Sequence, residues 1–165
     1  MNRIRKSAAI GSVVAAAALA VVGAPAAQAG PAPWCTSSDL MIKAYDVHPT
    51  GSAIKRHAIV FTTAEDVACT IGGTLGNVRF LDAKGADMNV PLANGQGEYR
   101  EVTVHGMFGP VAYVSSWDKG PRVTPAFVEF DLPGQKGSRG DRVTTAWPSW
   151  LGVNVGIQNI GWPVS

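Results

Sequence analysis

The chain contains two cysteines, Cys35 and Cys69, and both follow an N-terminal segment with the pattern of an export signal. In an oxidising compartment two cysteines most simply form one disulfide, because no reducing system keeps the thiols apart. Closing that loop constrains about 35 residues, which the chain-entropy account values at roughly 4 kcal/mol. We therefore predict a structural disulfide. The chain has no Cys-x-x-Cys motif, which redox-active cysteine pairs commonly have, and two distant thiols alone do not indicate a metal site.

The first 29 residues have the three parts of a secretory signal peptide. Basic residues within the first six positions precede an apolar run, and residues 27–29, Ala-Gln-Ala, form a small-residue cleavage site. We predict cleavage between Ala29 and Gly30, which leaves a secreted mature chain without a membrane span. An uncleaved N-terminal anchor is the alternative, although the apolar run is short for a span and a glycine and a proline interrupt it.

Removing this signal changes the charge of the protein. The full chain has 14 basic and 12 acidic residues, and the signal contains three of the basic ones. The mature chain therefore has 11 basic and 12 acidic residues, a net charge of −1 with neutral histidines. No basic stripe or polybasic segment remains, so neither nucleic acid nor a membrane surface is an expected partner. The 136 mature residues, 30–165, suit a single domain.

Helix signals are almost absent after residue 30. Glycine and proline recur roughly every 8–12 residues, between segments rich in valine, threonine and aromatic residues, which is the all-β pattern of a sandwich or barrel. The pattern predicts strands over 39–46, 56–63, 69–71, 77–81, 88–92, 99–104, 111–117, 126–132, 142–146 and 152–157.

One pair of these segments predicts a hairpin. Residues 77–81 and 88–92 flank Asp82–Gly85, an Asp-led turn with glycine in the left-handed position. Calcium binding by Asp82 and Asp87 is the alternative function of these carboxylates, but their spacing matches no known calcium loop.

The clearest alternation of apolar and polar residues lies in 126–132. It predicts an apolar inward face, with Glu129 and Asp131 pointing to solvent. The polar, glycine-rich residues 133–141 predict a loop. That loop includes Arg139-Gly140-Asp141, an integrin-type tripeptide, which we interpret as ordinary loop chemistry because three-residue matches recur by chance.

A family resemblance emerges from three segments. Residues 34–40 contain a Cys-Thr-x-x-x-Leu start, residues 68–73 read Ala-Cys-Thr-Ile-Gly-Gly, and residues 77–85 combine an apolar strand with an Asp-x-x-Gly turn. This order resembles the actinobacterial secreted family of unknown function numbered four-two-three-two, over roughly residues 35–157 and most strongly over 35–85. The resemblance implies an exported, immunoglobulin-like β-sandwich with the early cysteines joined. We accordingly predict an antiparallel sandwich of about eight strands with one disulfide. It implies no known activity.

The sequence contains no motif that indicates catalysis. The three histidines, His48, His57 and His105, match no zinc-site spacing, and we interpret them as surface or edge residues. No Gly-x-Ser-x-Gly or other local nucleophile signature is present. We therefore predict no catalytic residue, no metal site and no cofactor.

Tryptophans gather in the last third of the chain, including Trp117, Trp147 and Trp150. Indole rings stack on sugar rings and their N–H groups donate hydrogen bonds. We therefore take these three residues as candidate contacts for a cell-wall glycan. Core packing and loop anchoring are the alternative, because aromatic side chains bury about 150–250 Å² each.

These observations predict a secreted, non-catalytic module that binds, or has a structural role, at the cell envelope. Its partner would be a wall glycan or another envelope protein. A secreted hydrolase or an enzyme inhibitor, with a site built from dispersed loop residues, is the alternative because fold does not fix function.

Overall fold

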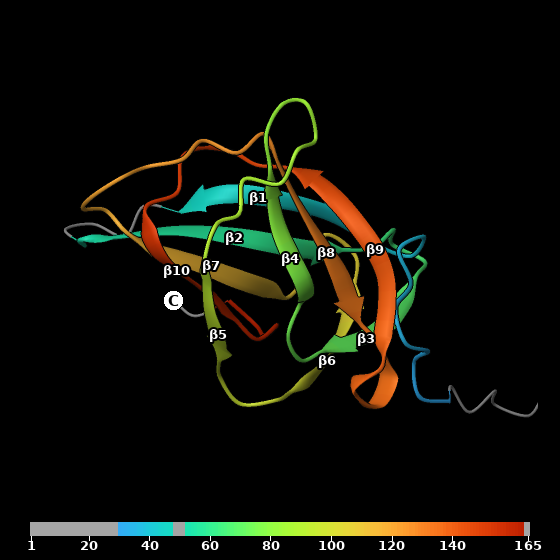
Figure 1. Ribbon diagram of the computed structural model, residues 1–165. Coiled ribbons are helices and arrows are strands. Elements are labelled where there is room, and N and C mark those ends of the chain that lie inside the picture. Colours follow the sequence, from blue (N-terminus) through green and yellow to red (C-terminus); the bar gives the residue numbers. More distant parts are fainter. Residues whose placement is uncertain (1–29, 48–51, 164–165) are drawn as a thin grey trace, which may run out of the picture.

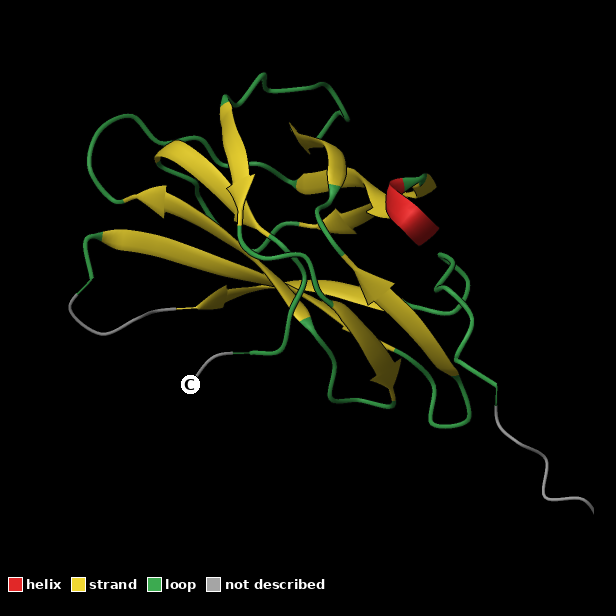
Figure 2. Cartoon of the chain, turned by 90° about the horizontal axis from the view of Figure 1, so that it is seen from below, coloured by secondary structure: helices red, strands yellow, loops and turns green. Residues whose placement is uncertain are grey.

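The computed structural model describes residues 30–47 and 52–163, and this part of the chain forms ten strands in three sheets (Figure 1). The predicted signal peptide, with Ala29, lies outside the described residues, and so does His48. The one helical piece among the described residues is a 3-10 turn, η1 (Gln135–Gly137), drawn red in Figure 2. The strands are β1 (Met41–Val47), β2 (Ile54–Thr62), β3 (Ala68–Gly72), β4 (Gly76–Leu81), β5 (Leu92–Gln96), β6 (Glu101–His105), β7 (Val111–Trp117), β8 (Phe127–Pro133), β9 (Arg139–Ala146) and β10 (Val153–Gln158).

The largest sheet has five strands in the order β1-β2-β7-β10-β5. Its neighbouring strands are antiparallel, except that β10 and β5 run parallel. Side chains alternate between the two faces along each strand. Ile59 of β2 lies opposite Ala112 of β7, and these residues share the buried inner face with Phe61 and Val114.

The other two sheets pack against this inner face. One is three-stranded, in the order β4-β8-β9, and the other pairs β3 with β6. In Figure 1 the strands β4, β8 and β9 cross in front of β1 and β2. Phe130 of β8 meets Phe61 of β2 edge to face, with ring centroids 6.4 Å apart. One hydrophobic core therefore contains side chains from all three sheets.

The disulfide prediction is confirmed: Cys35 is bonded to Cys69 of β3. The segment before β1 runs along β3, where the Cys35 amide donates to the Thr70 carbonyl (2.8 Å) and the Thr70 amide donates to the Pro33 carbonyl (2.7 Å). Both cysteines belong to the core. The bond therefore fixes the segment that precedes β1 onto the two-stranded sheet.

The Asp-led turn after β4 forms as predicted. The Asp82 amide donates to the Ala86 carbonyl (2.9 Å), and Gly85 has a positive φ of 82°. The Asp82 carboxylate accepts hydrogen bonds from the amides of Lys84 (2.8 Å) and Ala86 (2.9 Å). This carboxylate therefore holds the turn together.

The hairpin predicted across this turn is wrong. The returning chain meets β4 only at the Leu81–Asp87 bridge, and β4 pairs with β8 instead. Asn89 has a left-handed φ of 51°, and Pro91 has no amide hydrogen to donate, so a continuous ladder cannot form. The chain instead crosses to form β5 beside β10. The described residues thus contain ten strands and a parallel pair, where about eight antiparallel strands were expected.

The alternation predicted for β8 is confirmed on its apolar side and wrong at one polar residue. Three of the side chains predicted to point inward are buried: Val128, Phe130 and Leu132. Asp131, predicted to point to solvent, is only 2% exposed. Its carboxylate accepts hydrogen bonds from Arg142 Nε (2.9 Å) and Asn77 Nδ2 (2.6 Å), and these donors replace the water that it loses.

The integrin-type tripeptide belongs to a strand rather than to the predicted loop, because β9 begins at Arg139. The Asp141 carboxylate accepts a hydrogen bond from the Ser37 amide (2.8 Å). Arg139 Nε lies 3.1 Å from the Asp131 carboxylate. Both charged side chains of the tripeptide therefore bind within the protein.

Replacing Cys35 and Cys69 together by serine is expected to lower the free energy of unfolding by about 2–5 kcal/mol, because the unfolded chain gains freedom. Urea denaturation of the oxidised wild type and the double variant measures the difference. The reduced wild type should unfold at the midpoint of the variant, and the variant itself should not respond to the reductant. Equal unfolding free energies for the variant and the oxidised wild type would contradict the expectation.

Candidate functional site

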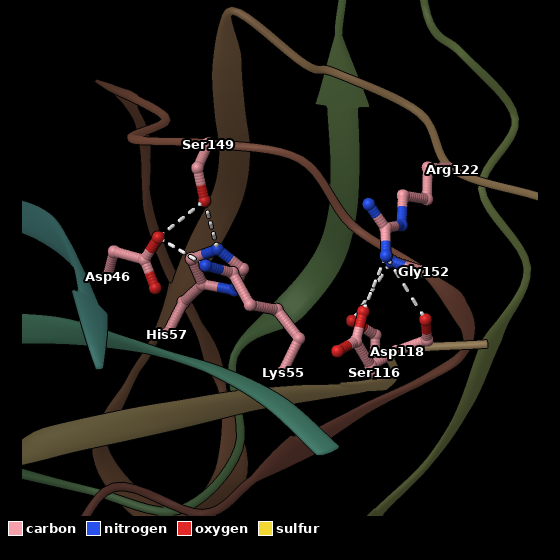
Figure 3. A network of polar contacts seen from close by, with 8 residues as sticks. All are labelled: Asp46, Lys55, His57, Ser116, Asp118, Arg122, Ser149 and Gly152. Atoms are coloured by element: carbon pink, nitrogen blue, oxygen red, sulfur yellow. Dashed lines mark hydrogen bonds and ion pairs between the residues drawn. The ribbon is translucent and has the colours of Figure 1, made fainter. Parts of the chain in front are cut away.

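Residues 147–152 connect β9 to β10 and carry two of the three tryptophans predicted to contact a ligand. Leu151 and Val123 exchange two backbone hydrogen bonds, of 2.8 and 2.9 Å. The Gly152 amide donates to Ser116 Oγ at 3.0 Å (Figure 3). Only glycine fits at position 152, because a Cβ there would lie 1.7 Å from the Trp117 carbonyl oxygen. The segment is therefore held tightly against β7.

Trp147 lies in the core. Its side chain is 6% exposed, and its ring centroid is 4.5 Å from that of His57 and 4.9 Å from that of Phe80. Neighbouring rings thus surround the indole, and no face of it is open to a sugar. Its contacts are those of a core residue.

Trp150 is half-buried, and two cationic side chains of the protein lie over its ring. The Arg122 guanidinium carbon is 3.9 Å from the ring centroid, and Lys55 Nζ is 5.1 Å from it. Asp118 holds Arg122 in place through an ion pair of 2.7 Å. Cations are attracted to the electron-rich face of an indole, so these side chains cover the surface that a sugar would use.

Four polar side chains at this end of the sheet form the network drawn in Figure 3: Asp46 of β1, Lys55 and His57 of β2, and Ser149. Ser149 Oγ lies 2.8 Å from Asp46 Oδ2 and 2.9 Å from His57 Nε2. Lys55 forms an ion pair with the same carboxylate. Lys55 and His57 are buried, so these contacts replace the water that both side chains lose on folding.

The Asp46 carboxylate is the charged centre of this network. Burial raises its pKa, but the hydrogen bonds from Lys55 and Ser149 and the positive charges of Lys55 and His57 outweigh burial and lower that pKa. The carboxylate is therefore ionised at neutral pH and accepts hydrogen bonds only. The Ser149 hydroxyl donates its single proton to Asp46, and its oxygen accepts from His57 Nε2–H.

This order of hydrogen bonds differs from that of a catalytic triad. In a triad the imidazole stands between the carboxylate and the hydroxyl, and it removes the hydroxyl proton. Here the Ser149 hydroxyl stands between Asp46 and His57, and its proton points to the carboxylate. The network instead anchors residues 147–152 to β1 and β2.

The remaining chemical candidates lie apart. His105 is exposed at the end of β6, while His57 is buried in β2. Within residues 30–47 and 52–163 no three side chains of His, Cys, Asp or Glu are grouped so that they could hold a metal ion. In the same part of the chain we find no helix of the length and apolarity that a membrane crossing requires.

The face of the five-stranded sheet that points away from the core carries many exposed apolar and aromatic side chains. We call it the outer face and define it by the outward side chains of three strands. Trp117 is 53% exposed and Tyr45 is 50% exposed, and Ile54 is also exposed. The register places the following residues on the outer face: Met41, Lys43, Tyr45, Val47, Ile54, Arg56, Ala58, Val60, Thr62, Val111, Tyr113, Ser115 and Trp117.

The outer face continues onto an apolar tip, formed by the turn between β6 and β7. Phe108 in this turn is 87% exposed, and its neighbour Met107 is also exposed. With Trp162 they border a shallow pocket of about 450 Å³, whose other side chains include Val60 and Val111. The outer face and the tip therefore form one continuous apolar surface.

Charge is sparse on the outer face. Lys43 and Arg56 are its cations, and none of its residues is a carboxylate. The Arg56 guanidinium lies over the Tyr113 ring, 5.3 Å from the centroid. Ala58 and Ser115 stand between the aromatic side chains. These small residues keep the surface shallow.

Of the three tryptophans predicted to contact a ligand, the structure leaves only Trp117 exposed. Sequence reasoning missed its neighbours Tyr45 and Tyr113. Period-two alternation could have found them, since Tyr113 and Trp117 are four residues apart on β7 and Tyr45 alternates with the apolar inward residues of β1.

Comparison with known proteins finds no relative: no family model, curated protein or solved structure matches this chain. The family resemblance drawn from the sequence therefore stays a prediction.

Replacing Asp46 by asparagine is expected to make the stability of the protein less dependent on acid pH. The folded state lowers the pKa of Asp46, so its contribution is present above the unfolded pKa of about 3.9 and is lost as pH falls through the folded pKa. Urea denaturation at several pH values below about 5 measures this slope.

The variant Ser149→Ala removes one hydrogen bond to Asp46 and keeps the Lys55 ion pair, so its slope should lie between those of the wild type and Asp46→Asn. Equal slopes for the wild type and Asp46→Asn would contradict the role given to this carboxylate.

Proposed function

We propose that this protein is a secreted, non-catalytic binding module whose outer face lies against an extended polysaccharide of the cell envelope. The observation that carries the proposal is the outer face itself, where Trp117 and Tyr45 are about half exposed among side chains that include no carboxylate. Exposed apolar surface of this kind commonly marks a binding site. Aromatic rings offer sugars an apolar platform, and their polar groups offer hydrogen bonds.

The spacing of the aromatic side chains favours a long ligand. Tyr113 and Trp117 are four residues apart on β7, which places them roughly 13 Å apart along the strand. Tyr45 lies in the row of Ala58 and Tyr113, two strands from β7, which is roughly 10 Å across the sheet. A ligand that touches these rings together must be extended, as a polysaccharide chain is.

The charges of the outer face restrict the class of polymer. Lys43 and Arg56 present positive charge, and the face has no carboxylate to attract a polycation. A neutral or acidic glycan therefore suits this surface. Arg56 is already oriented over Tyr113, so its guanidinium loses little freedom when it binds a hydroxyl or acidic group.

The finer fold and the cellular location are part of the same proposal. We infer an immunoglobulin-like sandwich, because the sheet β4-β8-β9 and the five-stranded sheet share one core. Export rests on the signal pattern of residues 1–29 and on the Cys35–Cys69 disulfide, since such bonds persist in oxidising compartments. Membership of the secreted family that the sequence resembles would fit both inferences.

The alternative functions gain no specific support. A hydrolase needs an activated nucleophile, whereas the Ser149 hydroxyl donates to Asp46 rather than to His57. An inhibitor or a partner protein of the envelope would also use an exposed apolar surface, so protein binding is an outcome that the test below separates.

Trp117→Ala and Tyr45→Ala are each expected to weaken binding to insoluble cell-wall polysaccharide about tenfold, because each removes one aromatic platform, and tenfold corresponds to about 1.4 kcal/mol. Sedimentation with wall polysaccharide stripped of protein measures the affinity. The matched control is Phe127→Ala, which removes an exposed aromatic side chain from β8, on a different sheet.

Thermal melting of each variant confirms that the fold is intact. Undiminished binding by both outer-face variants would refute the proposal. Binding that requires wall protein, and is absent from the stripped polysaccharide, would refute it in favour of a protein partner.

A further inference from the structure

A groove whose lining includes several polar side chains lies where the three sheets meet, away from the outer face. It encloses about 580 Å³, a volume within the range of about 300–1,000 Å³ that is usual for small-molecule sites. The ends of β3, β4 and β8, the turn that contains η1, and the segments before β6 and after β10 all contribute to it. Its polar side chains include Asn77, Tyr99, Asp131, Arg139 and Asn159.

Tyr99 forms one wall of this groove. Gly73 has a φ of +90°, and a Cβ at this position would lie 3.1 Å from Tyr99 Cε2. The glycine therefore lets the tyrosine ring approach the backbone closely. The Tyr99 hydroxyl donates to Glu101 Oε1 (2.8 Å), which fixes the ring orientation, while the side chain stays 51% exposed.

The buried Asp131 carboxylate orients other side chains of the lining. It accepts hydrogen bonds from Asn77 Nδ2 (2.6 Å) and Arg142 Nε (2.9 Å), and Arg139 Nε lies 3.1 Å from it. These contacts leave the Asn77 carbonyl oxygen and the two terminal nitrogens of Arg139 without a hydrogen bond to any described residue. An acceptor and a pair of donors are thus held in place and remain open for a ligand.

Hydrogen bonds to both polar atoms of its side-chain amide orient Asn159. Its oxygen accepts a hydrogen bond from the Thr74 hydroxyl, and its nitrogen donates to the Gly97 carbonyl (3.0 Å). Each of these atoms can form one further hydrogen bond. Because the polar groups of the groove are fixed by the protein, a ligand would lose little free energy in ordering them.

The charges around the groove offset one another. Asp131 faces the cations of Arg139 and Arg142, and Glu129 pairs with Arg79. A strongly charged ligand therefore gains little here. Fixed donors and acceptors in one groove with an aromatic ring instead suit a neutral molecule that has hydroxyl groups on its rim and C–H groups on its face.

From this arrangement we propose that the groove binds one neutral sugar residue, with a face of the sugar on Tyr99 and its hydroxyls bonded to Asn77, Arg139 and Asn159. The site takes a single residue, such as the end or a branch of a glycan, whereas the outer face would contact an extended chain. The two sites share no residue, so either can exist without the other.

Titration of the whole secreted protein with glucose, galactose, mannose, N-acetylglucosamine and glucuronate, each followed by NMR of the backbone amides, tests this site. At least one neutral sugar should shift amides of the groove residues. Tyr99→Ala should weaken that binding about tenfold, because it removes the aromatic wall. Asn77→Gly should weaken it by a similar factor, since glycine accepts the φ of 44° at this position and the change removes the side-chain amide, including its hydrogen bond to Asp131.

The matched control is Phe127→Ala, which removes an exposed aromatic side chain of β8 outside the groove and should bind the sugar as the wild type does. The proposal is overturned if none of the four neutral sugars shifts the groove amides, or if glucuronate alone does. It is equally overturned if Tyr99→Ala and Asn77→Gly, both folded by their amide spectra, bind with unchanged affinity.

Discussion

Burial of one face of the five-stranded sheet against the two smaller sheets is the constraint on which the rest of this structure depends. Phe61 and Ile59 of β2 and Phe130 of β8 are fully buried in the core that results. The opposite face is left to solvent, and the exposed face of an antiparallel sheet is usually polar. Here it carries Trp117 and Tyr45 instead. That departure from the usual pattern is the reason to assign the outer face a function.

At the start of β2 the inner face carries polar side chains in place of apolar ones, and the network around Asp46 follows from that change. Lys55 and His57 point to the same side as Ile59, so folding removes them from water. Asp46 and Ser149 supply the hydrogen bonds that make this burial tolerable. Residues 147–152 thus close the end of the core. This is why Trp147 and Trp150, which lie on either side of Ser149 in the sequence, serve packing rather than recognition.

Local patterns in the sequence were enough to predict the all-β class, the Cys35–Cys69 disulfide and the approximate position of most strands. They failed where a distant residue decides the outcome. The hairpin after β4 did not form because Asn89 and Pro91 interrupt the returning strand and β8 occupies the edge of β4. Asp131 is buried because Asn77, 54 positions away, and Arg142, directly opposite on β9, satisfy its carboxylate.

Local sequence patterns were also insufficient to predict most residues of the candidate sites. Trp117 was identified from its residue type alone, but its neighbours on the outer face come from separate strands, and only strand pairing brings Tyr45 into line with Tyr113. The groove is harder still to predict, since Tyr99, Asn77, Arg139 and Asn159 converge from four separate segments. No local pattern links these residues.

The most direct test of the central claim is an NMR map of the backbone amides in the presence of a soluble fragment of the wall polysaccharide. We expect the shifted amides to cluster along β1, β2 and β7, around Tyr45, Tyr113 and Trp117. Shifts confined to the groove beside Tyr99, or spread over β4, β8 and β9 with β7 unchanged, would contradict the claim that the outer face is the polysaccharide-binding surface.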